Sequence, residues 1–525
     1  MRLLTTASAL ALMGSVASAD YTLHIIHIND LHSRIQPINR FDSTCNAEDD
    51  AAGECFGGVA RVKTAIDALR ADLAGENVIV VDAGDQFQGS PFFTTYGGAA
   101  AAEFMNAIGF DVMASGNHEF NNGPEGLASF IGMVDFPVIS GNLDVSASPE
   151  LNGVLEDSVM LEVGGETIGI VSALTGDTAE ISSPGPNVVF MDEIEALRED
   201  VAAMEAAGVD KIIALTHVGL VKDLEIAQEV AGLDAVVGGH SHTLLSNTEE
   251  GAEAYPLLNA SGVPVVQAYA YSKYVGHLIL NFDDDGNVTA SNGATKVLDA
   301  SVEPDTAIAA RVAELGAPIE AMQQEVIGFS ETAVEGDRSF CRAEECEMGN
   351  LVSTAILERV KDQGIQIVFQ NGGGLRASLD AGDVTMGEVL TVLPFQNTLA
   401  TFQLSGAGVL AALENGVSRL EDGGGRFPQV AGMKYTFDPA AEVGARISDV
   451  MVEVDGALVP LDPAATYGVA SNNFMRGGGD GYSVFAEEGM NAYDFGPDLA
   501  DVVAEYIAEN GTGAAMLDGR ITKVE

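Results

Sequence analysis

Five short apolar runs in the first half of the chain each lead into side chains that can bind metal ions. The runs and the residues that follow them are 23–28 before Asp30 and His32, 78–81 before Asp85, 110–114 before Asn117 and His118, 211–215 before His217, and 233–237 before His240 and His242. Apolar runs of this length predict buried strands. Helical patterns over 59–73, 98–108, 194–207 and 224–231 alternate with them, which predicts an α/β domain.

In an α/β domain, ligands gather at the carboxyl ends of the strands, so the five strand ends should converge. Asp30 and His32 are two residues apart, as are His240 and His242, so the members of each pair point to the same side of an extended segment. Carboxylate, amide and imidazole groups without thiolates form a ligand set that accepts Zn, Mn, Fe or Co. Five of the eight histidines occupy these strand ends. The pattern therefore predicts a metal site.

The remaining three histidines are interpreted as core or surface residues. His24 and His27 lie inside the first predicted strand, and His277 lies in another apolar stretch. Histidines in such positions are more often core or surface residues than ligands. We therefore expect no metal-binding role for them.

The blocks that carry the candidate ligands resemble, in order and spacing, those of the calcineurin-like metallophosphoesterases. They read Asp30-Leu31-His32, Gly84-Asp85, Gly116-Asn117-His118-Glu119, Thr216-His217 and Gly239-His240-Ser241-His242. The resemblance implies two divalent metal ions that clamp a phosphoryl group and activate a bound water. The implied ligands are Asp30, His32, Asp85 and His242 for the first ion, and Asp85, Asn117, His217 and His240 for the second.

His118 and Asn121 are the catalytic pair that the resemblance implies. His118 would bind no metal and would stabilise developing charge or protonate the leaving oxygen. Asn121 stands where the 5'-nucleotidase branch of the family has an aspartate. Its amide oxygen can fix the tautomer of His118, but it offers an imidazolium no full opposite charge. We therefore expect the pKa of His118 to be lower than in relatives.

Three arginines in the second half stand beside glycine-rich or cysteine-closed turns. Arg338 and Arg342 flank Cys341, and Arg376 ends the block that begins at Asn371. A guanidinium fork suits phosphate oxygens, although solvated surface arginines would give the same pattern.

Further blocks here resemble the 5'-nucleotidase C-terminal domain: 371–376, 393–395 and 473–481. The resemblance implies that Phe395 and Phe474 sandwich a base and that Asp480 accepts hydrogen bonds from ribose hydroxyls. It also implies that the phosphate and sugar are held by four residues: Arg338, Arg342, Asn371 and Arg376. Without the family, both phenylalanines would be interpreted as core aromatics.

At 525 residues the chain is too long for a single hydrophobic core. Apolar residues recur at three- and four-residue steps from Ile308 to Val326, after a Pro-Asp-Thr start, which predicts an amphipathic helix between two domains. An ordinary core helix would give the same pattern. The expected division is a signal peptide over 1–19, a catalytic domain over 20–300, a linker helix over 301–328 and a substrate-binding domain over 329–525. The family implies a four-layer α/β/β/α sandwich followed by an α+β nucleotide-binding domain, whereas strand-helix alternation alone suggests one parallel sheet.

The N-terminal segment and the cysteines indicate where the protein is located. A positive start, a short apolar run and Ala17-Ser18-Ala19 are typical of a secretory signal peptide. An exported protein forms disulfides by default, so Cys45 should pair with Cys55 and Cys341 with Cys346. No later segment has 18 consecutive apolar residues, so we expect no membrane anchor and a periplasmic or secreted protein.

The net charge of −54 argues against nucleic acid or an anionic membrane surface as partner, since both require clustered basic residues. The expected partner is a small nucleotide. The leading hypothesis is a two-metal phosphohydrolase of nucleoside 5'-monophosphates, with di- and triphosphates or nucleotide sugars as further substrates. The alternatives are a 2',3'-cyclic nucleotide phosphodiesterase with 3'-nucleotidase activity, a thiosulfohydrolase of sulfur oxidation, and a nucleotide-binding protein without catalysis.

Overall fold

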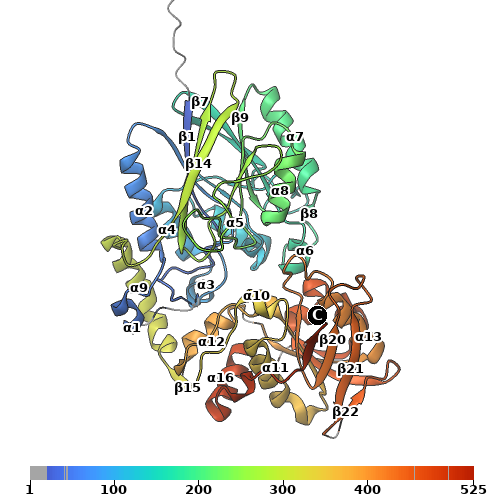
Figure 1. Cartoon of the computed structure of the whole chain (residues 1–525). Coiled ribbons are helices and arrows are strands. Elements are labelled where there is room, and N and C mark those ends of the chain that lie inside the picture. The colour runs from blue at the N-terminus through green and yellow to red at the C-terminus, as the bar shows by residue number, and fades with distance from the viewer. Residues whose placement is uncertain are drawn as a thin grey trace, which may run out of the picture.

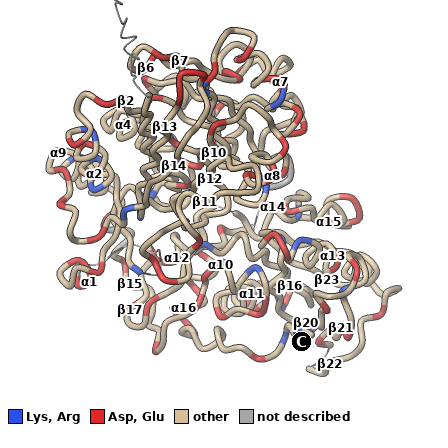
Figure 2. The backbone as a smooth tube through the Cα atoms, turned by 45° about the horizontal axis from the view of Figure 1, so that its top comes forward, with Lys and Arg blue, Asp and Glu red and all other residues tan. Residues whose placement is uncertain are grey.

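The computed structural model describes residues 21–524 except 41, 43–44, 46, 396, 455 and 495. The predicted signal peptide lies outside the described residues. The first half forms a layered domain, and the second half lies beside the end of that domain where the predicted ligands gather (Figure 1). No helix among the described residues is both long and apolar enough to cross a bilayer. Acidic residues are spread over both halves of the backbone (Figure 2).

Two mixed six-stranded sheets form the centre of the first half. The first runs in the order β14 (Val288–Val297), β13 (Tyr274–Phe282), β1 (Tyr21–Ile28), β2 (Asn77–Asp82), β3 (Val112–Ala114) and β4 (Val138–Ile139). The second runs in the order β11 (Leu257–Leu258), β12 (Pro264–Val266), β10 (Ala235–Val237), β9 (Lys211–His217), β7 (Glu166–Leu174) and β6 (Ser158–Val163). The pairs β1–β2, β2–β3, β7–β9 and β9–β10 are parallel.

The two sheets pack face to face. One apolar cluster joins side chains of both sheets, such as Ile25 and Val81 from the first and Ile170 and Leu215 from the second. The outer face of the first sheet is covered by α2 (Val59–Asp72), α4 (Ala99–Ile108) and α5 (Gly123–Ile131). The outer face of the second is covered by α7 (Glu193–Ala206) and α8 (Leu220–Glu229). The four-layer α/β/β/α sandwich is therefore confirmed, and a single parallel sheet is not formed.

Shorter elements complete this half. They are α1 (Ala47–Ala52), α3 (Pro91–Tyr96), the 3-10 turn η1 (His118–Phe120), β5 (Leu143–Asp144), α6 (Thr178–Ile181) and β8 (Val189–Phe190). The predicted strand over 110–114 begins only at Val112; Asp111 before it is exposed, and its backbone N–H donates to the carbonyl of Val80 in β2. The helix predicted over 224–231 begins at Leu220, directly after Gly219, which adopts a left-handed φ of 86°.

The helix α9 (Thr306–Gln323) lies where the linker helix was predicted. Asp305 caps its first turn by accepting hydrogen bonds from the backbone N–H groups of Ala307 and Ile308. Val312 and Ile319 pack into the core of the first half. The same helix also contacts α3 and α12 (Met386–Val392). It ends before Val326, which belongs to a strand, so the apolar pattern ran past the end of the helix.

The second half is built on a five-stranded sheet in the order β19 (Pro428–Ala431), β16 (Ile367–Asn371), β23 (Thr466–Asn472), β18 (Leu399–Ser405) and β24 (Met490–Tyr493). A four-stranded sheet follows the order β22 (Ala457–Pro460), β21 (Ile447–Val454), β20 (Met433–Phe437) and β25 (Ile521–Lys523), and β15 (Val326–Ser330) pairs with β17 (Gly382–Thr385). Its helices and 3-10 turns are α10 (Arg338–Cys341), α11 (Glu347–Val360), η2 (Lys361–Gln363), η3 (Gly372–Gly374), α13 (Gly406–Gly416), α14 (Asn473–Arg476), η4 (Gly479–Gly481), α15 (Ser483–Glu488), α16 (Leu499–Asn510) and η5 (Gly513–Ala515). The α+β prediction for this half is confirmed.

Both predicted disulfides are present, Cys45–Cys55 and Cys341–Cys346. The second closes the turn between α10 and α11, and Sγ of Cys346 also accepts a hydrogen bond from the backbone N–H of Gly349 in the first turn of α11.

Candidate metal centre and nucleotide pocket

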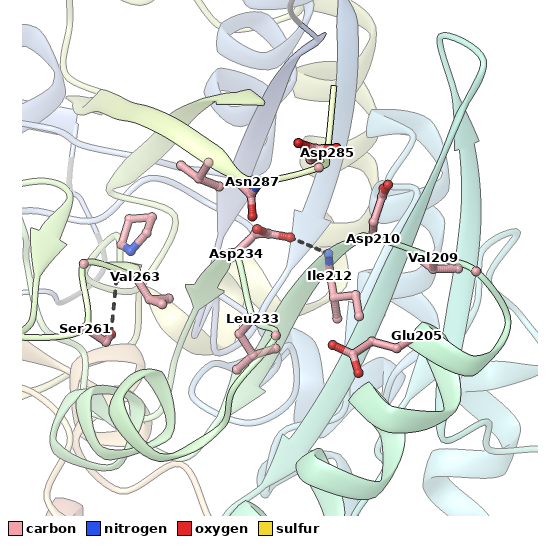
Figure 3. Close-up of a pocket in the computed structure, with 16 residues that line it drawn as sticks. Glu205, Val209, Asp210, Ile212, Leu233, Asp234, Ser261, Val263, Asp285 and Asn287 are labelled. Carbon is pink, nitrogen blue, oxygen red and sulfur yellow. Dashed lines mark hydrogen bonds between the residues drawn. The ribbon is translucent and has the colours of Figure 1, made fainter. Parts of the chain in front are cut away.

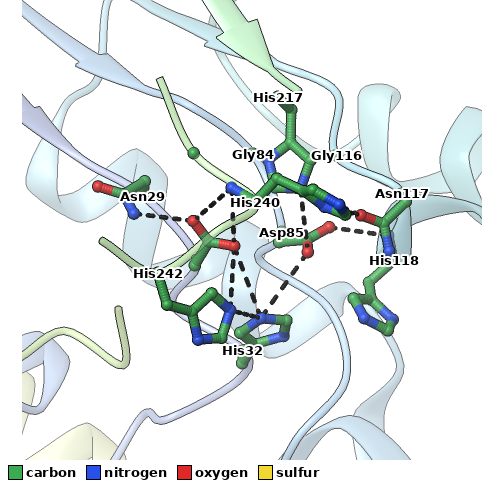
Figure 4. Close-up of polar contacts among 12 residues, drawn as sticks. Asn29, His32, Gly84, Asp85, Gly116, Asn117, His118, His217, His240 and His242 are labelled. Atoms are coloured by element: carbon green, nitrogen blue, oxygen red, sulfur yellow. Dashed lines mark hydrogen bonds and ion pairs between the residues drawn. The ribbon is translucent and has the colours of Figure 1, made fainter. Parts of the chain in front are cut away.

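The strand-end residues predicted as ligands come together at one place (Figure 4). They follow β1, β2 and β3 of the first sheet, and they end β9 or follow β10 of the second. Both sheets therefore contribute to the centre. All are buried except His240, which is partly exposed.

One group of side chains lies around His32. Its Nε2 atom is 2.9 Å from Nε2 of His242, and the same atom of His242 is 3.2 Å from Oδ1 of Asp30. Oδ2 of Asp85 lies 3.7 Å from Nε2 of His32. The ligand atoms of Asp30, His32 and His242 all lie within 4.8 Å of one another, which suits a single divalent ion.

A second group lies on the other side of Asp85. Its Oδ2 atom is 3.1 Å from Nε2 of His217. Oδ1 of Asn117 is 3.1 Å from the same nitrogen and 2.9 Å from Nδ1 of His240. Asp85 thus belongs to both groups, the position expected of a residue that bridges two ions.

The hydrogen bonds of two histidines support metal binding. The Nδ1–H group of His217 donates to the carbonyl oxygen of Ala83 at 2.7 Å, and that of His32 donates to the carbonyl of Phe87 at 3.3 Å. The Nε2 atoms of both histidines face the carboxylate of Asp85, at 3.7 Å for His32 and 3.1 Å for His217. A metal-ligating histidine typically donates its other ring N–H to a backbone carbonyl in this way, so these residues fit a metal ion.

Strained backbone accompanies the candidate ligands. Asp30, His32, Asp85, His240 and His242 all have positive φ values, between 50° and 74°. Non-glycine residues rarely adopt this conformation, and it clusters at functional sites where the surrounding structure enforces it. Gly84 must be glycine, because a Cβ there would lie 2.7 Å from the backbone nitrogen of Gly116.

Glu119 is a supporting residue to which the sequence analysis gave no role. Its buried carboxylate accepts hydrogen bonds from the backbone N–H groups of Asp85, Gln86, Phe87 and Gly116, at 2.6 to 3.1 Å. It therefore holds the loop of Asp85 against the loop of Asn117. The sequence signal for this role is that Glu119 belongs to the same block as Asn117 and His118.

Gln267 supports the second sheet's ligands in the same way. Its side chain donates to the carbonyl of Gly239, and it accepts hydrogen bonds from the Ser241 hydroxyl and the Thr243 backbone N–H. A single glutamine after a short apolar strand carries no signal in the sequence.

Burial is the largest cause of the pKa shifts of Asp30, Glu119 and His118. It raises the pKa of Asp30 to about 6 and, with Asp85 acting in the same direction, raises the pKa of Glu119 to about 7. Burial lowers the pKa of His118 to about 4, although Asp85 and the hydrogen bond to Asn121 act in the opposite direction.

His118 lies at the junction of the two halves. Its Nδ1–H group donates to Oδ1 of Asn121 at 2.6 Å, as the sequence predicted. Its ring stacks on Phe395 from the second half, with 5.7 Å between ring centroids. The guanidinium of Arg376 lies 5.5 Å from the centroid of the same Phe395 ring, and its Nη2 atom is 3.4 Å from Nε2 of His32.

A cavity of about 1020 Å³ connects the metal centre with the second half. It is lined by all of the residues predicted to bind the nucleotide: Arg338, Arg342, Asn371, Arg376, Phe395, Phe474 and Asp480. His118 and Asn121 line it from the first half. The prediction that these residues share one site is therefore consistent with the fold.

The sequence did not indicate three charged residues in this wall: Arg419, Arg426 and Asp177. Arg419 and Arg426 add positive charge, and Arg419 forms an ion pair with Asp177 of the first half. Asp177 precedes α6, which contacts η4, the turn that carries Asp480. These contacts depend on how the two halves meet, so no local pattern could reveal them.

A second hollow, of about 580 Å³, lies among the loops around Asp210 and Asp234 (Figure 3). These residues stand just before β9 and β10, at the end of the strands opposite His217 and His240. Its lining contains carboxylates but no histidine and no arginine. It therefore differs in chemistry from the metal centre.

Comparison with known proteins agrees with this geometry. The family described as calcineurin-like phosphoesterase matches residues 23–244, and the 5'-nucleotidase C-terminal domain matches residues 326–487. The 5'-nucleotidase of Homo sapiens is 36% identical, over 98% of this chain and 94% of the relative. The snake venom 5'-nucleotidase of Gloydius brevicauda is 35% identical, over 97% and 90%.

The crystal structure of the 5'-nucleotidase precursor from Thermus thermophilus superimposes with a TM-score of 0.90 at 39% identity, covering 96% of this chain and 100% of that one. Both the order of the domains and the strand-end ligand blocks are thus accounted for by one family. The chain belongs to the 5'-nucleotidase family of calcineurin-like metallophosphoesterases, and it is a metal-dependent phosphoric ester hydrolase.

Proposed function

We propose that the protein is an exported 5'-nucleotidase that releases phosphate from nucleoside 5'-monophosphates with the aid of two divalent metal ions. The observation that carries the proposal is the cavity in which strand-end histidines and Asp85 face Arg376, Phe395 and Asp480 of the second half. A phosphate at the ligands would leave the attached nucleoside among these residues.

Asp30, His32, Asp85 and His242 would hold one ion, and Asp85, Asn117, His217 and His240 the other. Bound there, the ions would polarise the phosphoryl oxygens and lower the pKa of a water. Zn, Mn, Fe and Co all suit this ligand set. The chain's own hydrogen bonds orient these ligands: the backbone N–H of His240 donates to both oxygens of Asp30, at 2.9 and 3.2 Å.

His118 would act on the leaving oxygen. Because its Nδ1–H group is engaged by Asn121, its Nε2 atom is the one that can carry the transferred proton. The ring is buried against Phe395, which keeps it in one orientation. Arg376 would stabilise negative charge on the phosphate from the side of the second half.

The nucleoside would be held by the second half. Phe395 and Phe474 would stack on the base, which favours no particular base. Asn371 and Asp480, joined by a hydrogen bond of 2.6 Å, would face the ribose, and Arg338 and Arg342 would complete the phosphate and sugar side. Di- and triphosphates or nucleotide sugars are further candidate substrates of the same cavity.

The domain division that we propose is a signal peptide over 1–19, a catalytic domain over 20–300, a linker over 301–328 and a substrate-binding domain over 329–525. The signal sequence and the two disulfides support export to a periplasmic or extracellular space. A nucleotide remains the proposed partner, rather than nucleic acid or a membrane.

The test is phosphate release from AMP by the mature protein as purified, after chelation, and after addition of Mn or Zn. Activity that disappears with the chelator and returns with metal supports the proposal. Asp85→Asn, which removes the shared ligand, should abolish the recovery, whereas Asp210→Asn in the second hollow should not. A folded protein that releases no phosphate from AMP with any of the metals would overturn it.

A second candidate is hydrolysis of 2',3'-cyclic nucleotides, which the asparagine at position 121 favours. The same assay with 2',3'-cyclic AMP distinguishes the two substrates. A higher kcat/KM for the cyclic nucleotide than for AMP would make it the main activity.

A further inference from the structure

A buried asparagine behind the nucleotide pocket connects the walls of that pocket. Asn472 is the last residue of β23, and its side chain has no solvent exposure. Its Nδ2 group donates to Oδ1 of Asn371 at 2.8 Å and lies 3.3 Å from Oε1 of Gln370. It does not line the cavity itself, so it can act only through the residues that do.

The oxygen of the same Asn472 amide contacts α14, the turn that contains Phe474. Oδ1 of Asn472 accepts a hydrogen bond from the backbone N–H of Met475 at 2.8 Å and thereby caps α14, the turn that carries Phe474. Asparagine is among the residues that perform this capping best, because its side-chain oxygen reaches the third residue along. The orientation of the Asn472 amide is determined, since its oxygen must face Met475 and its nitrogen must face Asn371.

The hydrogen bonds continue to the ribose side of the pocket. Asn371, which accepts from Asn472, donates through its own Nδ2 group to Oδ2 of Asp480 at 2.6 Å. Asp480 itself has a positive φ of 56°, so its position depends on contacts from its surroundings. Asn472 therefore has bonded contacts toward Phe474 on one side and toward Asp480 on the other.

We propose that Asn472 is a positioning residue for nucleoside recognition: it sets the spacing between the Phe474 ring and the Asp480 carboxylate. The inference rests on the proposed function, because it assumes that a nucleoside binds between these two groups. Buried polar networks of this kind hold a single geometry when every member is satisfied. A substitution of Asn472 should therefore alter the affinity for the nucleoside even though Asn472 does not contact it.

Two substitutions separate the two hydrogen bonds. Asn472→Asp keeps the oxygen that caps α14 but places a second oxygen against Oδ1 of Asn371, whereas Asn472→Ala removes both bonds. The matched control is Asn350→Ala. Asn350 is equally buried in the same half, and its side chain bonds Glu345 and the carbonyl of Met516, away from the pocket.

The readouts are AMP kinetics, binding of adenosine to the metal-free protein by calorimetry, and hydrolysis of p-nitrophenyl phosphate, which has no nucleoside. We expect Asn472→Asp to raise the KM for AMP and the Kd for adenosine about tenfold. A decrease in affinity of this size is typical when a buried hydrogen bond is lost and one of its polar atoms is left without a partner. The ratio of kcat/KM for AMP to that for p-nitrophenyl phosphate should fall by about the same factor. Asn350→Ala should leave this ratio unchanged.

The outcomes distinguish the inference from the proposed function. If the wild type hydrolyses AMP and binds adenosine, but Asn472→Asp leaves both constants unchanged, the positioning role is wrong and the proposed function stands. If Asn472→Asp and Asn350→Ala lower the ratio equally, the effect is general destabilisation and the inference is also wrong. A wild type that hydrolyses p-nitrophenyl phosphate but neither binds adenosine nor hydrolyses AMP overturns the proposed function together with the inference.

Discussion

Oδ1 of Asn121 lies 2.6 Å from Nδ1 of His118 and accepts a hydrogen bond from it. The amide determines which nitrogen carries the proton but brings no negative charge to the ring. Burial consequently dominates and holds the pKa of His118 at about 4. This pair therefore differs electrostatically from a histidine beside a carboxylate.

Asn121→Asp should raise the pKa of His118, because a carboxylate stabilises the imidazolium. The limb of the pH profile of kcat/KM that reports His118 should then move to higher pH, by about one unit for one added charge at hydrogen-bond distance. The measurement is the pH dependence of AMP hydrolysis for both proteins with the same metal. Asn122→Asp adds the same charge at the neighbouring position and should leave the limb in place; an identical shift in both variants would contradict the prediction.

Phe395→Ala should weaken nucleotide binding. The ring contacts both His118 and the guanidinium of Arg376 and lines the cavity, so its loss removes a contact for both neighbours and the proposed stacking surface for the base. Stacking of a base on an aromatic side chain contributes about 1 to 3 kcal/mol, so we expect KM for AMP to rise roughly five- to hundredfold. Phe329→Ala, which removes a phenylalanine that is 57% exposed on β15, is the control. Equal KM values for wild type and Phe395→Ala would exclude Phe395 as a base contact.

Glu119→Gln should lower metal occupancy. The carboxylate accepts four backbone N–H groups, and an amide would direct its own NH₂ group at some of these donors. The Asp85 loop should then lose its position, with a fall of about 10- to 100-fold in metal affinity, as for other groups that orient ligands. Metal content by mass spectrometry after dialysis checks this. Glu125→Gln on the exposed side of α5 should retain its metal; full occupancy in Glu119→Gln would refute the positioning role.

Asp200→Asn should stabilise the protein at alkaline pH. Burial, with Asp157 and Glu199 nearby, raises the pKa of Asp200 to about 7, and its Oδ2 atom has no hydrogen-bond partner. Because the folded state favours the protonated carboxyl, stability falls as pH rises from the ordinary aspartate pKa of about 4 to about 7. The amide stays neutral, so the free energy of unfolding should increase by about 1 to 2 kcal/mol at pH 8 and by less at pH 5.

Urea unfolding of the two proteins at both pH values measures the difference. Glu199→Gln removes an exposed charge next to Asp200 and should change stability little at either pH. A gain for Asp200→Asn that is equal at pH 5 and pH 8 would mean that titration of Asp200 is not its cause.

The residues of the candidate metal centre could be predicted from local sequence. Short apolar runs followed at once by aspartate, asparagine or histidine place their polar groups at strand ends whatever sheet those strands join, so Asp30, Asp85 and His217 could be recognised from their own neighbours. The apolar period also located α2, α4, α7, α8 and α9, and the close spacing of the cysteines indicated both disulfides.

The boundaries of elements were less predictable, since they depend on tertiary contacts. Val326 continues the apolar period of α9 but pairs in β15 with β17. Strand-helix alternation suggested one sheet, yet β3 belongs to the first sheet and β9 to the second. Alternation along the chain does not specify which strand hydrogen-bonds to which, and the family resemblance was needed to expect two sheets.

Sequence by itself therefore predicted a metal site built from residues at the ends of buried strands, because residue type and position after an apolar run are local properties. Only the tertiary structure decided that Glu119 binds the backbone of the Asp85 loop, that Phe395 reaches His118, and that Asn472 stands between Phe474 and Asp480. These relationships join segments up to several hundred residues apart, and they exist only once packing and buried hydrogen bonds have brought those segments together.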